Sequence, residues 1–294
     1  MRIWLLGRFR TSVGHKAAIE ESQWRLRKPA KLVKLLALAP NHLMHREQAM
    51  DLLWPDLDPK AAANNLRHAL HVACRTLEKP SEASASPRSL LLRGGELELW
   101  PAVTLWVDVE AFERAVESAR RAREPTAYQA ALNLYAGDLL PEDRYEGWAE
   151  ARREELRRLY LTSLVELATP YEERGEFGPA AEALRRVVQS EPAHEEAHVG
   201  LMHLYALSGE RQRALVQYER LRETLLRELG AEPGAASRHL HEEIVKVGFT
   251  PACLLQQERS PEEPWAPVGT TYPTTLPASL GTNGSSSRSI ASWR

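Results

Sequence analysis

Two stretches decide how the first third of the chain folds: PKAAANNLRHALHVACRTLEK at residues 59–79 and LLLRGGELELW at residues 90–100. Asp58 and Pro59 open the first stretch as an N-cap acceptor followed by a proline in the first helical turn. On a helical wheel of about 100° per residue, four apolar side chains fall within an arc of about 60°. This predicted buried stripe consists of Leu66, Leu70, Ala73 and Leu77. The second stretch alternates apolar and polar residues around a Gly-Gly pair, which is typical of a β-hairpin.

The segments before residue 59 complete a recognisable order of elements. Residues 2–10 are predicted to form a strand, and residues 16–27 are strand-like at best. Pro29 opens a helix that ends at Pro40, and a second short helix covers about residues 45–54. A strand, three helices and a terminal hairpin predict a winged helix-turn-helix in which the long third helix precedes the wing.

The polar face of helix 59–79 is the first candidate site. No aspartate or glutamate occurs on it before Glu78. Arginine pairs with guanine edges and asparagine with adenine edges in a major groove. The face carries Lys60, Asn64, Arg67, His68, His71 and Arg75. An ordinary solvated face is the alternative, and the helix alone does not decide between the two. Together with the winged layout, the pattern favours DNA binding.

The predicted wing carries Arg93 beside the Gly-Gly turn, where an arginine could enter a minor groove or contact phosphate. Hairpin tips are often charged for solubility, so this reading also has a structural alternative. A further basic cluster either adds contacts to the DNA backbone or is merely exposed. It consists of Arg25, Arg27, Lys28, Lys31 and Lys34.

Composition sets the class of protein. The 294 residues are 43% hydrophobic and 27% charged, which suits two ordinary globular domains. Residues 1–100 hold 16 Lys or Arg against 10 Asp or Glu, whereas residues 101–294 hold 22 against 30. We therefore expect the first third to meet a polyanion and the remainder not to. With two cysteines, no signal-peptide pattern and no long apolar segment, a cytoplasmic location is expected.

An internal repeat marks the second half of the chain. Four matched pairs of residues each lie 34 positions apart, which is the period of tetratricopeptide helix pairs. The pairs are Leu167 and Leu201, Tyr171 and Tyr205, Gly175 and Gly209, and Ala180 and Ala214. Helix pairs of this kind stack and expose grooves suited to peptides or other helices.

The sequence gives little support for a metal site or for an enzyme active site. His68, His71 and Cys74 include zinc-ligand types, but Cys74 lies about 120° around the helix from His68, a poor geometry for a third ligand. His42 and His45 are interpreted as loop and cap residues. Motifs for phosphate loops, dinucleotide binding, zinc proteases and nucleophile elbows do not occur. We expect no enzyme activity, no cofactor and no metal.

The segments Arg27–Leu38, Leu52–Asp56 and Asn65–Arg67 resemble the OmpR-type winged helix of the actinobacterial antibiotic regulatory protein family. Later motifs are similar to the bacterial transcriptional activator domain of that family. They are Val107-Asp108-Val109 with Phe112, Tyr135 with Gly137-Asp138-Leu139-Leu140-Pro141, Trp148-Ala149 with Arg152, Glu195 with Ala197-His198 and Leu201-Met202, and Glu228-Leu229-Gly230-Ala231-Glu232-Pro233.

The resemblance implies a transcriptional activator that binds direct repeats upstream of a promoter, often as a dimer on DNA, and recruits RNA polymerase. By resemblance, the recognition helix carries Asn64, Arg67, His68, His71 and Arg75, and the wing carries Arg93. An adaptor whose winged helix makes protein contacts is the alternative function. Larger relatives continue into a nucleotide-binding domain, and Thr274–Leu280 resembles the linker to it.

The expected fold is mainly α-helical, with an N-terminal winged helix of mixed α and β structure followed by a tetratricopeptide-like repeat domain. The expected boundaries are 1–102 for the DNA-binding domain and 103–250 for the activator domain. Residues 251–294 are expected to be a disordered tail, because 20 of the 35 residues from Ser260 are Ser, Thr, Pro or Gly.

Overall fold

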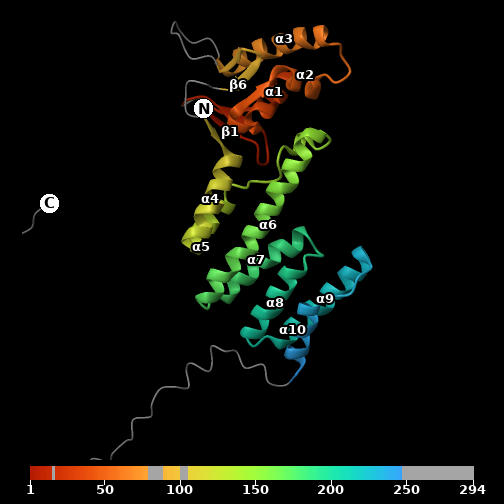
Figure 1. Ribbon diagram of the computed structural model, residues 1–294. Coiled ribbons are helices and arrows are strands. Elements are labelled where there is room, and N and C mark those ends of the chain that lie inside the picture. Colours follow the sequence, from red (N-terminus) through yellow and green to blue (C-terminus); the bar gives the residue numbers. More distant parts are fainter. Residues whose placement is uncertain (15–16, 79–88, 100–104, 247–294) are drawn as a thin grey trace, which may run out of the picture. The chain divides into compact units, whose positions relative to one another are not determined.

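The computed structural model describes residues 1–14, 17–78, 89–99 and 105–246. Small sheets and three helices come first, and a succession of helices follows (Figure 1). This confirms the expected fold class, mainly α with a winged helix before helical repeats. The predicted tail, the linker-like segment and Cys253 lie outside the described residues. No described helix has the length and apolar character needed to span a bilayer.

The first sheet contains four short strands in the order β3-β2-β1-β7, with β1 antiparallel to β2 and parallel to β7. Their bounds are β1 Arg2–Trp4, β2 Arg10–Ser12, β3 Ile19–Glu20 and β7 Trp106–Val107. The single strand predicted over residues 2–10 is therefore wrong. The chain leaves the sheet after Trp4 and turns at Gly7, whose φ of 82° suits glycine, before it returns as β2.

Three helices form the body of the N-terminal part, as the sequence predicts. Their bounds are α1 Arg27–Leu38, α2 Arg46–Leu53 and α3 Pro59–Glu78. Each lies within about two residues of its predicted range, the usual uncertainty of a helix end. His45 caps α2 by accepting a hydrogen bond from the Glu47 amide, which confirms its interpretation as a cap. His42, expected in a loop, is instead the last residue of a short 3-10 helix, Pro40–His42.

The predicted hairpin is present and belongs to a sheet of three strands. Its strands are β4 Leu43–His45, β5 Leu90–Arg93 and β6 Glu96–Leu99, in the order β4-β6-β5. Gly94 and Gly95 form the turn, with φ angles of 61° and 93° that L side chains rarely adopt. The hairpin is therefore a wing whose inner edge is paired with the segment before α2.

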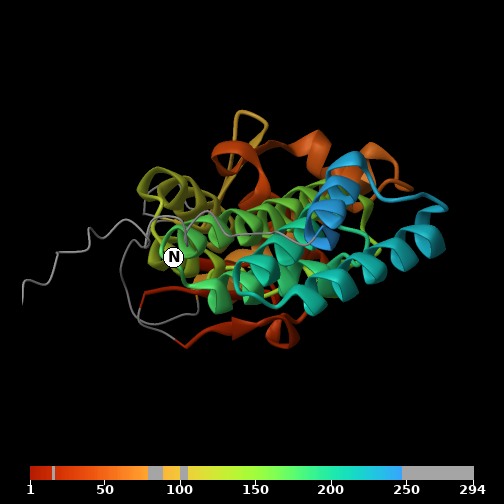
Figure 2. The ribbon, with the colours of Figure 1, turned by 90° about the horizontal axis from the view of Figure 1, so that it is seen from below.

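The remainder is helical. The helices are α4 Asp108–Ala122, α5 Pro125–Leu132, α6 Glu150–Glu173, α7 Phe177–Ser190, α8 Glu195–Leu207, α9 Arg211–Leu229 and α10 Ala235–Val245. Consecutive helices from α4 to α10 contact one another, and this includes α5 and α6, which a longer connection separates in sequence. α8, α9 and α10 lie together in both Figure 1 and Figure 2.

The 34-residue repeat is confirmed in detail. Gly175 and Gly209 have φ angles of 73° and 75° at equivalent turns. The amide that follows each glycine bonds back to the carbonyl of the matched tyrosine, Glu176 to Tyr171 at 2.9 Å and Glu210 to Tyr205 at 2.8 Å. The matched leucines, tyrosines and alanines are all buried. Each repeat therefore buries the same apolar positions against its neighbours.

A buried carboxylate joins the first strand to the helices that begin with α4. Asp108 is 2% exposed and accepts hydrogen bonds of 2.9 Å from the amides of Leu5, Leu6 and Val109. Burial raises the pKa of Asp108 to about 6, and the backbone hydrogen bonds oppose this rise. One apolar core extends from the N-terminal helices to Phe112 and Leu139, and a second core lies among α4 to α10. Met1–Phe249 form one compact unit.

Candidate nucleic-acid interface

Helix α3 begins at a well-formed cap. Asp58 Oδ1 accepts hydrogen bonds from the amides of Lys60 at 3.0 Å and Ala61 at 3.1 Å. These amides would otherwise lack partners in the first helical turn. At the other end, the Glu78 carboxylate accepts a hydrogen bond of 2.5 Å from the Ser89 amide. Both ends of the 20-residue helix are thus fixed to the segments beside them.

The apolar side of α3 packs against α1 and α2. Leu66, Ala73 and Leu77 are buried as predicted, at 2%, 0% and 1% exposure. Leu70 is only half-buried, and Ala69 is buried at 2% exposure beside it. The buried stripe of α3 is therefore shifted slightly from the predicted one, with Ala69 buried where Leu70 was predicted. The small alanines allow α3 to approach its neighbours closely.

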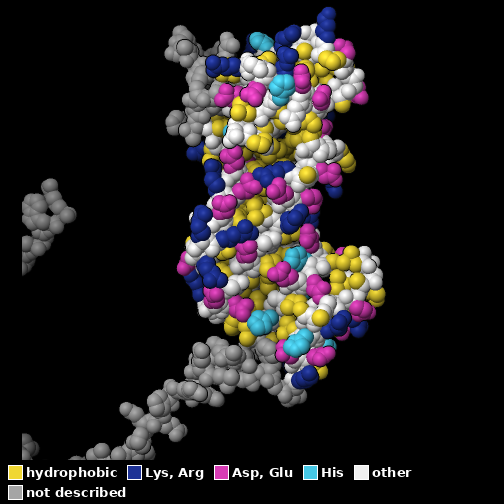
Figure 3. Space-filling view, viewed as in Figure 1, with side chains coloured by type: hydrophobic (Ala, Val, Ile, Leu, Met, Phe, Trp, Pro, Cys, Tyr) yellow, Lys and Arg dark blue, Asp and Glu magenta, His cyan; other side chains and the backbone are white. Residues whose placement is uncertain are grey.

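All six predicted side chains of the opposite face are exposed. They follow one another at spacings of one to four residues along a single side of α3, namely Lys60, Asn64, Arg67, His68, His71 and Arg75. We call these six residues the α3 face. Figure 3 shows Lys, Arg and His side chains over this helix. Among the described residues, none of its cationic side chains forms an ion pair.

One internal contact orders the α3 face. Arg67 Nη1 donates a hydrogen bond of 2.6 Å to Asn64 Oδ1, three residues earlier. The bond leaves the asparagine amide nitrogen and the rest of the guanidinium available to a partner. Side chains held in place before binding lose less conformational entropy when they meet a ligand.

Arg93, on the wing, is also exposed but belongs to a separate element. Two contacts hold the hairpin in addition to its pairing with β4. Cys74 Sγ of α3 lies 3.7 Å from the carbonyl oxygen of Leu90, where the hairpin begins. The amide of Arg46, at the start of α2, donates to the carbonyl of Gly95 at 2.9 Å. These contacts fix the wing relative to α2 and α3.

The additional basic cluster is only partly exposed. Lys34 has 0% exposure and pairs with two carboxylates, and Lys31 pairs with Glu146. Neither lysine is free to contact a DNA backbone, so that interpretation is wrong for these two positions. Their partners lie 13 to 115 residues away in sequence, and a local pattern of charges contains no signal for such partners. Arg25, Arg27 and Lys28 are exposed.

Metal binding is the other kind of site that the sequence of α3 raised. Within the ranges that the structure describes, no group of three His, Cys, Asp or Glu side chains is placed to hold a metal ion. His68 and His71 stay exposed, whereas Cys74 is half-buried and points its sulfur toward the wing.

A long helix with an exposed cationic and amide face, packed on two shorter helices and followed by a two-stranded wing, defines a winged-helix DNA-binding regulator. The helical repeats after residue 107 match the model of the bacterial transcriptional activator domain over residues 107–245. The chain belongs to the antibiotic regulatory protein family of bacterial transcriptional regulators.

Two relatives support this assignment. The regulatory protein DnrI of Streptomyces peucetius is 31% identical over 236 residues, which cover 75% of this chain and 85% of DnrI. The transcriptional regulator RedD of Streptomyces coelicolor is 30% identical over 262 residues, covering 84% of this chain and 71% of RedD. The functions named for both relatives are regulatory rather than enzymatic.

The fold is also that of a solved structure. The structure of Mycobacterium tuberculosis EmbR in complex with a low-affinity phosphopeptide superimposes with a TM-score of 0.69 at 20% sequence identity. The match covers 83% of this chain and 64% of the EmbR chain, so this chain spans about two thirds of the length of EmbR.

Proposed function

We propose that the protein binds repeated sites in promoter DNA by placing the α3 face in the major groove. The observation that carries this proposal is the set of exposed cationic and amide side chains on α3, none of them paired with an acid among the described residues. Double-stranded DNA supplies both the phosphates and the base edges that such groups recognise.

The positions along α3 suggest a division of roles. Lys60 lies exposed in the first turn of α3, and its ammonium group would contact a phosphate. Arg67, which donates a hydrogen bond to Asn64, would read a guanine edge near the middle of the helix. Arg93 on the wing would contact phosphate or the minor groove beside the same site.

The same proposal assigns a function to each of the two expected domains. Residues 1–102 would provide the DNA-binding domain and residues 103–250 the activator domain. The activator domain would contact RNA polymerase and would bring two copies together on adjacent repeats. Support comes from the matched activator-domain model and from the stacked helix pairs, which offer protein-binding grooves.

The test is a titration of a promoter fragment, selected from the host genome with the wild-type protein, followed by fluorescence anisotropy. Arg67→Ala and Arg75→Ala should each weaken binding about tenfold or more, because a good base or phosphate contact is worth roughly 1–3 kcal/mol. Arg121→Ala, at an exposed position of α4, is the matched control and should leave the affinity unchanged.

Salt dependence separates DNA binding from the adaptor alternative. Loss of one phosphate contact reduces the slope of log K against log salt by roughly 1. An adaptor would select no fragment and show no such slope. Wild-type affinity in both α3 variants would refute the assignment of this helix.

A further inference from the structure

The hydrogen bond between Arg67 and Asn64 determines which way round the asparagine amide lies. Arg67 Nη1 lies 2.6 Å from Asn64 Oδ1. A guanidinium group carries five N–H donors and no acceptor, so only the oxygen end of the amide can bond to it. The amide nitrogen of Asn64, with two N–H donors, is therefore the end of this exposed side chain that stays available to a partner.

Hydrogen-bond acceptors are scarce on the α3 face once this bond is made. Lysine and arginine carry donors only, and the face contains no Asp, Glu, Gln, Ser or Thr. Asn64 Oδ1 is the one amide oxygen of the set, and Arg67 bonds to it. The imidazole rings of His68 and His71 are the other groups of the set that can accept. Asn65, the other exposed asparagine of α3, lies about 100° around the helix from Asn64 and outside this face.

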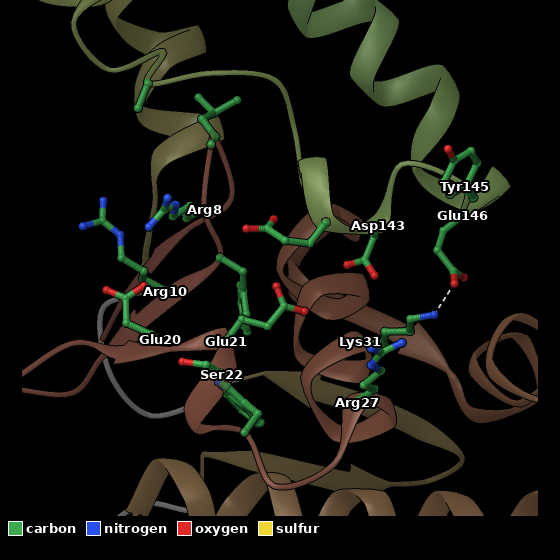
Figure 4. A pocket seen from close by; sticks show the side chains of 16 residues that line it. Arg8, Arg10, Glu20, Glu21, Ser22, Arg27, Lys31, Asp143, Tyr145 and Glu146 are labelled. Carbon is green, nitrogen blue, oxygen red and sulfur yellow. Dashed lines mark hydrogen bonds and ion pairs between the residues drawn. The ribbon is translucent and has the colours of Figure 1, made fainter.

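Acids elsewhere in the chain do not supply the missing acceptors. Among the described residues, no carboxylate forms an ion pair with the α3 face. Glu78, at the end of the same helix, accepts its hydrogen bond from the Ser89 amide. Helix α1 differs, because Lys31 there pairs with Glu146 (Figure 4). The cations of α3 therefore keep their N–H donors for a partner outside the chain.

The second lone pair of Asn64 Oδ1 does not restore an acceptor for DNA. An amide oxygen has two lone pairs, and Arg67 uses one of them. A base amino group that reached the other would lie against the guanidinium group, whose N–H groups and positive charge repel a second donor. In its hydrogen-bonding behaviour, the pair of side chains is a surface of donors.

The four bases differ in what they present to such a surface. In the major groove, guanine presents the acceptors N7 and O6, and thymine presents the acceptor O4. Adenine presents the acceptor N7 beside the donor amino group N6, and cytosine presents the donor amino group N4. A surface of donors therefore fits guanine and thymine, whereas it leaves the amino group of adenine or cytosine facing other donors.

We propose that Asn64 and Arg67 act as one unit that reads two keto bases, guanine or thymine, on adjacent base pairs. Arg67 donates to guanine through the N–H groups that its bond to Asn64 leaves over, and Asn64 donates to the acceptors of the neighbouring base. This inference rests on the proposed function, in which the α3 face lies in the major groove. It gives Asn64 a role other than the usual pairing of asparagine with adenine, which needs the amide oxygen as an acceptor. Arg67 is then the residue that determines specificity at both base pairs.

The base preference at the position read by Asn64 tests the proposal. Each base pair of one repeat in the selected promoter fragment is replaced in turn, and the affinity of the full chain is measured by fluorescence anisotropy. The position read by Asn64 is the one at which Asn64→Ala removes discrimination between bases. There the wild type should bind guanine or thymine about tenfold more tightly than adenine or cytosine, as expected for one good base contact.

Arg67→Ala should change the base preference of a residue that it leaves intact. Without the guanidinium group, Asn64 Oδ1 can accept from adenine N6 while Nδ2 donates to N7. The preference at the Asn64 position should then move toward adenine by about tenfold relative to the wild type, although the affinity for the original fragment falls. A residue that only supported the fold would change the affinity for all four bases alike.

Two control variants separate this effect from a general loss of charge. Arg67→Lys keeps a donor within reach of Asn64 Oδ1 and should keep the preference for guanine or thymine at the Asn64 position. Arg75→Ala removes an exposed cation two turns further along α3, so the affinity should fall while the preference at the Asn64 position stays the same.

The possible failures are distinguishable. If the wild type prefers adenine at the Asn64 position, if Asn64→Ala alters discrimination at no position, or if Arg67→Ala leaves the preference unchanged, the inference is overturned while DNA binding by α3 stands. If the wild type binds no fragment, the proposed function is overturned and this inference with it.

Discussion

Lys34 Nζ lies 2.5 Å from Asp143 Oδ2 and joins α1 to the activator domain across 109 residues of sequence. The lysine has 0% exposure, and the same ammonium group lies 4.7 Å from the centre of the Phe9 ring. Glu21 provides its second carboxylate. A buried cation with this many compensating contacts is stable only while all of them remain in place.

Lys34→Met should therefore lower the free energy of unfolding by about 3 kcal/mol, because it leaves the Asp143 carboxylate buried and unpaired. Urea denaturation of the full chain measures this change. The double variant Lys34→Met/Asp143→Leu should regain part of the loss, since only the partly exposed Glu21 carboxylate then remains without its partner. Lys60→Met, at an exposed position, is the control. Simple additivity of the two single changes would contradict the coupling.

Asp108 makes the free energy of unfolding depend on pH. Its pKa of about 6 in the folded state lies above the ordinary aspartate pKa of 3.8, so the folded state holds the proton more tightly than the unfolded chain does. The contribution of this group to stability is therefore greatest below pH 4 and is lost as the pH rises to about 6. Relative to Asp108→Asn, the wild type should lose up to about 3 kcal/mol of unfolding free energy across that range.

Unfolding titrations at several pH values between 4.5 and 7.5 check this expectation. The variant Asp138→Asn, an exposed carboxylate near the same strand, controls for general effects of charge. Parallel pH profiles for the wild type and Asp108→Asn would show that the buried carboxylate does not titrate in this window.

Gly200 and Gly178 are both helical glycines, but their surroundings differ. A Cβ atom at Gly200 would lie 2.6 Å from Leu184 Cδ1, whereas a Cβ at Gly178 meets nothing within 4 Å. Gly200→Ala should destabilise the repeat domain by about 1–3 kcal/mol through overpacking. Gly178→Ala should be neutral or stabilising by up to about 1 kcal/mol, because alanine favours the helix. Thermal unfolding distinguishes the two, and equal shifts in Tm would refute close packing of α7 on α8.

Asp58→Ala removes the cap of α3 and should cost about 1 kcal/mol. Amide hydrogen exchange at Lys60 and Ala61 should accelerate, because these two amides lose their acceptor. Asp56→Ala changes an exposed carboxylate in the same loop and serves as the control. Equal exchange in the two variants would show that the cap does not hold the end of the helix.

Local patterns predicted the parts of the fold that depend on neighbouring residues. The stripe on α3, the Gly94-Gly95 turn and the 34-residue repeat all arise from periodicity or turn chemistry within a short window. The strands β4 and β7 were missed, because each has only two or three residues and its partner strand lies about 50 to 100 residues away.

The candidate site shows the same difference between features set by local patterns and features set by contacts between distant segments. The α3 face was predicted position by position, since exposure follows directly from the helical period. The burial of Lys34 could not be predicted, because its two carboxylates come from other elements and lysine is almost always exposed. A cavity lined by Arg8 and Arg27 likewise exists only once three distant segments meet.

The parallel pairing of β1 with β7 affects how the protein is made. During synthesis, strand Arg2–Trp4 leaves the ribosome about a hundred residues before its neighbouring strand, Trp106–Val107. Until then the amides of Leu5 and Leu6 have no Asp108 to bind, and one side of the strand stays open to wrong partners. A fragment cut at residue 102 would keep that immature state permanently, so preparations of the DNA-binding part should extend past Leu140, whose amide also bonds to Leu5.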